Sequence, residues 1–197
     1  LMGPSSVMAL RQWRTFLRET FLVYELDDLF TNMPKLSSLR GNVPADARSY
    51  LARALRHCHR LVVSTDYLAE AYGHMIDDVR VVPNRLPRDI WTNLTPQKRT
   101  GKRPRVGWAG GTTHEGDLRQ IADVVAATAA EVEWVFMGMC PEAIRPYVAE
   151  LHPFGNYDEY PERLAALNLD LAVAPLEIHP FNRGKSNLRL LEYGALG

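Results

Sequence analysis

Short apolar runs alternate with helix-like segments along most of this 197-residue chain. Such runs are typical of buried strands, and parallel strands require a crossover connection that is usually a helix. The alternation therefore predicts parallel βαβ units and an α/β fold. The predicted strands lie within residues 21–26, 60–65, 79–84, 105–110, 132–138, 148–154 and 169–176, and the predicted helices within 12–19, 45–57, 66–75, 115–130, 141–149, 160–167 and from 186 onward.

The clearest shift in composition is at residues 92–104, which are rich in Asn, Thr, Pro, Lys, Arg and Gly. Polar, Pro- and Gly-rich stretches are typical of domain boundaries. We therefore expect two Rossmann-like parallel-sheet domains, residues 1–90 and 105–197, joined by a linker at 91–104. Both domains are expected to be incomplete, because the first has about three strands and the second stops at Gly197, where a further strand would follow.

Charge and composition narrow the classes of partner. Lys plus Arg and Asp plus Glu each number 23, so no global field points to nucleic acid or an anionic membrane, and any anion site must be local. No apolar run reaches the length of about 18 residues that a membrane span needs, and the start does not read as a signal peptide. Cys58 and Cys140 lack metal-ligand spacing, which favours a reducing cytoplasm and no metal site.

The last segment, residues 181–197, reads as a polar loop that opens a helix, with Ser186 as the expected N-cap. Arg183 and Lys185 lie near the start of this helix, where the macrodipole already favours negative charge. A bound phosphate would account for these cations, and Glu192, further along the helix, could accept hydrogen bonds from ribose hydroxyls. The alternative is a solvated basic loop with Glu192 near the surface.

A glycine-rich turn follows the predicted strand at 105–110. Gly110 and Gly111 allow close approach of a ligand, and Thr112 and His114 supply hydrogen-bonding groups. The glycine spacing fits neither the dinucleotide-binding fingerprint nor a Walker A loop. Because turns at the carboxyl ends of parallel strands share one rim, this turn and the loop at Lys185 could face one ligand.

Two acids, Asp27 and Asp28, end the first predicted strand. Carboxylates at the carboxyl end of a parallel strand lie where open α/β sheets bind ligands. A turn or a helix cap would explain Asp28 equally well.

Five motifs resemble bacterial glycosyltransferases of the O-antigen biosynthesis type, which have two Rossmann-like domains, the GT-B fold. The resemblance covers about residues 21–197, and its last two motifs are the most specific. The motifs are Tyr24-Glu-Leu-Asp-Asp, Val62-Val-Ser-Thr, Val81-Val-Pro-Asn-Arg-Leu, Val106-Gly-Trp-Ala-Gly-Gly with His114 and Asp117-Leu, and Lys185-Ser-Asn-Leu-Arg-Leu-Leu-Glu-Tyr-Gly-Ala.

The resemblance implies a donor site in the second domain and an acceptor site in the first. Glu192 matches the glutamate that holds the donor ribose. The helix start that meets the diphosphate and the glycine-rich loop beneath it complete the donor-binding set, which is Gly110, Gly111, Thr112, Arg183, Lys185, Ser186, Asn187, Leu188 and Glu192.

The expected catalytic residues are His114, Asp27 and Asp28. His114 would hydrogen-bond a phosphate or the sugar, or cap a helix, and either acid would orient the acceptor. Two positions depart from the family pattern: Gly184 stands where a second glutamate is common, and Glu115 where a basic residue is usual.

The leading hypothesis is transfer of a sugar from a nucleotide diphosphate sugar to a glycan or lipid-linked acceptor in surface polysaccharide synthesis. It implies a cytoplasmic bacterial enzyme without cofactor, metal or nucleic acid, and it is compatible with peripheral membrane association. The alternatives are a sugar-nucleotide epimerase or hydrolase, a nucleotide-sugar binding module without catalysis, and a Rossmann pair without a ligand. The base, the sugar, the acceptor and the stereochemical outcome are not set by these motifs.

Overall fold

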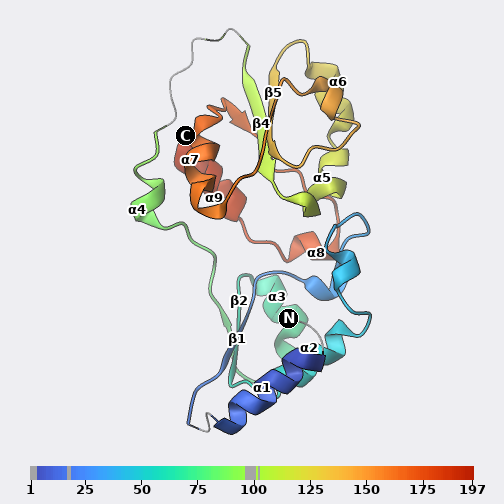
Figure 1. Ribbon diagram of the computed structural model, residues 1–197, viewed down its shortest axis with the longest axis vertical. Helices are drawn as coiled ribbons and strands as arrows, with labels where there is room; N and C mark the ends of the chain where they lie inside the picture. The colour runs from blue at the N-terminus through green and yellow to red at the C-terminus, as the bar shows by residue number, and fades with distance from the viewer. Residues whose placement is uncertain (1–3, 17–18, 96–100, 102) are drawn as a thin grey trace. The chain divides into compact units, whose positions relative to one another are not determined.

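The computed structural model describes residues 4–16, 19–95, 101 and 103–197 (Figure 1). The chain forms two compact units. Unit 1 contains Leu1–Pro34, Leu39–Asn84 and Ile178–Ser186, and unit 2 contains Lys35–Ser38, Arg85–Glu177 and Asn187–Gly197. Each unit has one sheet, and every strand pair in both sheets is parallel. The predicted α/β class with two parallel sheets is therefore confirmed.

Unit 1 is built on a three-stranded sheet in the order β1-β2-β3. Its register pairs Leu26 of β1 with Val63 of β2 and Val63 with Val81 of β3. The elements of unit 1 are α1 (Pro4–Phe16), β1 (Val23–Leu26), η1 (Phe30–Asn32), η2 (Arg40–Asn42), α2 (Ala47–Leu55), β2 (Arg60–Val63), α3 (Asp66–Tyr72), η3 (Gly73–Met75), β3 (Val79–Val81) and α8 (Pro180–Arg183).

The core of unit 1 includes a residue from the far end of the chain. Phe181 in α8 is 4% exposed and packs with buried leucines of β2, α2 and α3. The Thr65 hydroxyl donates to the Gly184 carbonyl oxygen at 3.1 Å, and the Asn84 amide donates to the Ser186 hydroxyl at 2.9 Å. Residues 178–186 thus belong to unit 1, whereas we expected them in the domain at 105–197. The expected linker at 91–104 lies partly outside the described residues.

Unit 2 contains a four-stranded sheet in the order β6-β5-β4-β7. The chain begins this sheet in the middle, moves outward through β5 to β6, and returns to place β7 on the other side of β4. Its elements are α4 (Arg88–Trp91), β4 (Arg105–Gly110), η4 (Thr112–His114), α5 (Glu115–Arg119), α6 (Ala122–Thr128), β5 (Glu133–Gly138), η5 (Arg145–Tyr147), β6 (Glu150–His152), η6 (Tyr157–Glu159), α7 (Tyr160–Ala166), β7 (Leu171–Ala172) and α9 (Leu188–Leu196).

Helices cover both faces of the unit 2 sheet (Figure 1). Side chains alternate along a strand, so Trp134 and Phe136 of β5 pack with α5 and α6, while Val135 and Met137 pack with α7 and α9. A strand buried on both faces must be apolar at nearly every position. This requirement explains why both central strands of unit 2 could be located from the sequence.

Several predicted elements differ from the structure. The predicted helix at 141–149 is wrong: the segment forms turns and the short helix η5, since Pro146 lacks the N–H that a continuous α-helix would need at this position. The helix predicted over 115–130 is two helices, α5 and α6, and only two residues of the run 169–176 are in β7. The N-cap position of α9 is Asn187, not Ser186, whose hydroxyl accepts a hydrogen bond within unit 1.

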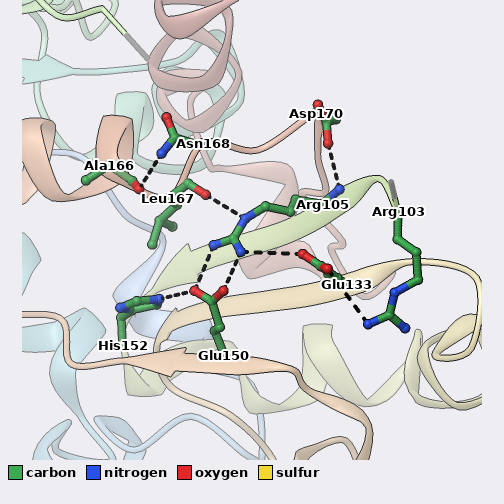
Figure 2. A network of polar contacts seen from close by, with 9 residues as sticks. All are labelled: Arg103, Arg105, Glu133, Glu150, His152, Ala166, Leu167, Asn168 and Asp170. Carbon is green, nitrogen blue, oxygen red and sulfur yellow. Dashed lines mark hydrogen bonds and ion pairs between the residues drawn. The ribbon is translucent and has the colours of Figure 1, made fainter. Parts of the chain in front are cut away.

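A polar network ties together the amino-terminal ends of the unit 2 strands (Figure 2). Arg105, the first residue of β4, is 8% exposed and makes a two-pronged pair with the carboxylate of Glu150, the first residue of β6. Its Nε also donates to the Leu167 carbonyl oxygen at 3.0 Å, and the Glu133 carboxylate lies 3.6 Å from its Nη1. The guanidinium thus holds three strands and the end of α7 in register.

None of the helices formed within the described ranges of the chain is both long and apolar enough to cross a membrane.

Candidate functional site

The sheet of unit 2 has a switch point beside β4. The next two strands in the chain, β5 and β6, lie on one side of β4, and β7 lies on the other. In open α/β sheets, the crevice outside the carboxyl ends of the strands at such a point is the usual ligand position. Pairing of β4 with β7 reaches only from Val106 to Gly107, and further along β4 the Ala109 N–H donates to the Tyr193 hydroxyl at 3.1 Å. α9 therefore lies against the open end of β4.

The two glycines at the end of β4 differ in what surrounds them. A Cβ added at Gly110 would lie 2.5 Å from the Trp108 ring and 3.0 Å from Nη1 of Arg189, so packing explains this glycine. A Cβ at Gly111 would have nothing within 4 Å, and its φ of −85° suits any residue. The fold thus gives no steric reason for glycine at 111, and the space beside it is open to a ligand.

Glu192 lies in the second turn of α9 and is 9% exposed. Its Oε2 accepts a hydrogen bond of 2.9 Å from the Tyr160 hydroxyl and lies 3.3 Å from Nε of Arg189. Burial raises the pKa of the Glu192 carboxyl, while the hydrogen bond from Tyr160 and the charge of Arg189 oppose that shift. Burial likewise raises the pKa of the Tyr160 hydroxyl, which keeps it a hydrogen-bond donor.

Arg189 connects Glu192 with the turn after β4. Its guanidinium lies 5.8 Å from the centre of the Trp108 ring and 5.9 Å from that of Tyr193, and one of its nitrogens adjoins Gly110. A cation held between two rings and a carboxylate is fixed in position. The first turns of α9 thus place a positive and a negative group at the carboxyl end of β4.

His114 occupies the N-cap position of α5, yet its side chain does not cap the helix. Instead, Nδ1 of the imidazole lies 2.8 Å from Oδ2 of Asp117. The ring also packs edge-on against Trp108, with ring centres 5.8 Å apart. The sequence left open whether His114 would hydrogen-bond a phosphate or the sugar, or cap a helix. The prediction of a helix cap is wrong.

Residues of unit 2 line cavities on the surface of the described part of the chain. One, of about 600 Å³, lies between the start of α5 and the turn after β5, and Glu115, Arg119, Met139 and Cys140 contribute to its lining. Another, of about 260 Å³, lies between α7, β7 and the end of α9 and is lined mainly by apolar residues. The larger cavity has the volume of a small-molecule site and lies along the carboxyl edge of the sheet.

Five predicted residues of the donor and catalytic sets lie in unit 1: Asp27, Asp28, Arg183, Lys185 and Ser186. Asp28, which follows β1, has its Oδ1 3.6 Å from Nζ of Lys185, and Lys185 lies over the Phe181 ring at 4.7 Å. The Asp27 carbonyl oxygen accepts a hydrogen bond from Ser64. Arg183 is exposed and lies 4.6 Å from the centre of the Tyr67 ring.

The predicted donor-binding residues are therefore divided between the two units. Unit 2 holds Gly110, Gly111, Thr112, Asn187, Leu188 and Glu192, and unit 1 holds Arg183, Lys185 and Ser186. The Thr112 hydroxyl shares a hydrogen bond of 2.8 Å with Ser38. Tyr160 was missed by the sequence reasoning, because a tyrosine 32 residues from Glu192 carries no signal of that contact.

Within the described ranges, His, Cys, Asp and Glu side chains form no group of three or more that could hold a metal ion.

Comparison with known proteins gives little further information. No protein-family model matches the sequence, and no curated protein matches it. Among solved structures, the chain is similar to the crystal structure of accessory secretory protein 1, 2 and 3 in Streptococcus pneumoniae, at 12% identity and a TM-score of 0.39. The match covers 87% of this chain and 41% of the other, so the chain spans about two fifths of that protein's length. This similarity supports no functional assignment.

Proposed function

We propose that the chain binds a nucleotide diphosphate sugar and acts as a glycosyltransferase of the O-antigen biosynthesis type. The sugar would pass to a glycan or lipid-linked acceptor in surface polysaccharide synthesis. The proposal rests on the motif resemblance together with the arrangement at the switch point of unit 2. No cofactor is required, because the nucleotide is itself the leaving group.

The observation that carries the proposal is the buried carboxylate of Glu192. Burying a carboxylate raises its free energy unless partners compensate, and Tyr160 and Arg189 both engage the same oxygen, Oε2. The other oxygen, Oε1, then remains for a ligand with paired hydroxyl donors, such as ribose. A carboxylate held in this way beside a glycine-rich turn matches the ribose-binding role that the resemblance implies.

The other residues would serve the diphosphate. The guanidinium of Arg189 adjoins Gly110, and the open space at Gly111 would let phosphate oxygens approach the backbone. Catalysis would then come mainly from stabilising the charge that develops on the departing diphosphate. In unit 1, Lys185 would supply a further positive charge, and Asp27 or Asp28 would orient the acceptor.

A thermal-shift screen against nucleoside diphosphates and their sugars tests the proposal, since a ligand that binds only the folded state raises the melting temperature. We expect one base to stabilise the protein selectively. Gly111→Ala should abolish this shift without lowering the melting temperature of the free protein, because its Cβ meets only open space. The matched control is Gly194→Ala, which also meets open space but lies outside the proposed site. A screen without any shift, from folded protein, would refute the proposal.

One observation favours the second candidate, a nucleotide-sugar binding module without catalysis. A Cβ at Gly184 would lie 3.0 Å from the Leu68 side chain and 3.3 Å from Leu29, so a glutamate there would press against the core of unit 1. The glutamate that commonly contacts the sugar in the glycosyltransferases with similar motifs is thus absent from this position. Ligand binding without hydrolysis or transfer, measured with a panel of acceptors, would favour the module.

A further inference from the structure

The pair formed by His114 and Asp117 joins two loops at the carboxyl end of the unit 2 sheet. Asp117 is 4% exposed, and its two oxygens have different partners. Oδ2 contacts Nδ1 of His114 at 2.8 Å, and Oδ1 accepts the backbone N–H of Glu177 at 2.8 Å. His114 belongs to the segment after β4 and Glu177 to the segment after β7, so one carboxylate links the loops on both sides of the switch point.

A second contact supports this link independently. A Cβ placed at Gly116 would lie 2.6 Å from the Glu177 carboxylate, which shows that the side chain of Glu177 packs directly on the start of α5. The segment after β7 therefore touches α5 through both its backbone and a side chain. The imidazole of His114 is held as well by the edge-on contact with Trp108.

The contact with Asp117 determines where the proton of a neutral His114 lies. An ionised carboxylate only accepts hydrogen bonds, so Nδ1 must be the donor. A neutral imidazole has one proton, and with that proton on Nδ1 the other nitrogen, Nε2, carries a lone pair. Nε2 then accepts hydrogen bonds from hydroxyl donors.

We propose that Asp117 is a positioning residue that holds His114 in the Nδ1–H tautomer, so that Nε2 accepts a hydrogen bond from a sugar hydroxyl of the donor. This inference rests on the proposed function and makes it more specific. It assigns His114 to the sugar instead of the phosphate, because phosphate oxygens are acceptors and offer nothing to a lone pair. The sugar would then lie on the side of the turn where α5 begins.

The tautomer can be observed directly. Protein with ¹⁵N-labelled histidine, studied by long-range ¹H–¹⁵N correlation at pH 8.5, should show the Nδ1–H tautomer for His114. In Asp117→Asn, the amide oxygen can still accept from Glu177 while its N–H donates to Nδ1, which moves the histidine proton to Nε2. The Nε2–H tautomer in the unaltered protein would overturn the inference.

Binding is the second readout, measured by calorimetry with UDP, GDP and dTDP and with UDP-glucose, GDP-mannose and dTDP-rhamnose. Asp117→Asn should weaken the affinity for the sugar conjugate about three- to tenfold, which is the effect of one neutral hydrogen bond. The affinity for the free diphosphate should not change. His114→Asn serves as a second variant, because it keeps a donor for Asp117 but removes Nε2, and it should show the same selective loss. The double variant should lose no more than either single one.

The outcomes separate the inference from the proposed function. If the diphosphates bind, and the variants weaken the binding of the free diphosphate and of its sugar conjugate equally, His114 does not contact the sugar. The inference then fails while the proposed function stands. If no nucleotide of the panel binds to the folded protein, the proposed function fails and the sugar contact fails with it, whichever tautomer is observed.

Discussion

The pair between Arg105 and Glu150 at the amino-terminal edge of the unit 2 sheet should stabilise the fold in a pH-dependent way. The hydrogen bond from the Arg105 guanidinium lowers the pKa of the Glu150 carboxyl from 4.5 to about 2. A carboxyl group whose pKa is lower in the folded than in the unfolded state stabilises the protein at pH values above its ordinary pKa. Glu150→Gln removes the charge and keeps the size, so it isolates this contribution.

The magnitude follows from the shift and the exposure of the side chain. A fall of the pKa from 4.5 to about 2 corresponds to about 3.4 kcal/mol of unfolding free energy if nothing screens the charges. The Glu150 side chain is 42% exposed, however, and solvent weakens exposed ion pairs. We therefore expect Glu150→Gln to lower the free energy of unfolding by about 1–2 kcal/mol at pH 7. This loss should disappear as the pH falls from 4.5 to about 2.

Urea unfolding followed by tryptophan fluorescence is a suitable assay, because Trp91, Trp108 and Trp134 all lie in unit 2. The control is Glu159→Gln, which removes a solvent-exposed pair with Arg163 and should change stability by less than about 0.5 kcal/mol. If Glu150→Gln cost the same free energy at pH 3 as at pH 7, the loss would be one of packing, and the electrostatic reasoning would be refuted.

Three further predictions concern unit 1 and the candidate site. Phe181→Ala should destabilise unit 1 by about 3–5 kcal/mol, which should appear as faster hydrogen exchange in α3. The control is Ile178→Ala, which alters a fully exposed side chain and should have no effect. Unchanged exchange in Phe181→Ala would contradict the packing argument. Glu192→Gln should raise the melting temperature at pH 8 but not near pH 4, because burial raises the pKa of the carboxyl and penalises its charge; a lower melting temperature at pH 8 would argue against this. Lys185→Ala should weaken nucleotide affinity by about 1.5–3 kcal/mol in calorimetry, and an unaltered affinity would remove Lys185 from the site.

The parts of the fold that could be predicted are those with a local physical cause. The two-sided burial of β4 and β5 demands long apolar runs, and such runs are visible without any knowledge of partners. The α-helix predicted at 141–149 does not form, because Pro146 has no N–H to donate within it.

The candidate site was only partly predictable. Gly111 and Glu192 follow from short motifs, but the contacts that define their surroundings join residues far apart in the sequence. Arg105 shows the same limit: nothing at the start of an apolar strand indicates that its guanidinium will be buried against a carboxylate 45 residues away. Likewise, an apolar residue in a polar loop, such as Phe181, does not reveal which core it enters.

The position of Phe181 in the core of unit 1 has a consequence for how the protein is made. The ribosome synthesises the strands of unit 1 within the first 84 residues, but the side chain that completes their core emerges almost 100 residues later. Contacts of such long sequence separation form slowly, and exposed apolar surface favours aggregation in the meantime. Unit 1 should therefore reach its final stability only after Phe181 has been synthesised, and a chain stopped at residue 90 should remain only partly folded.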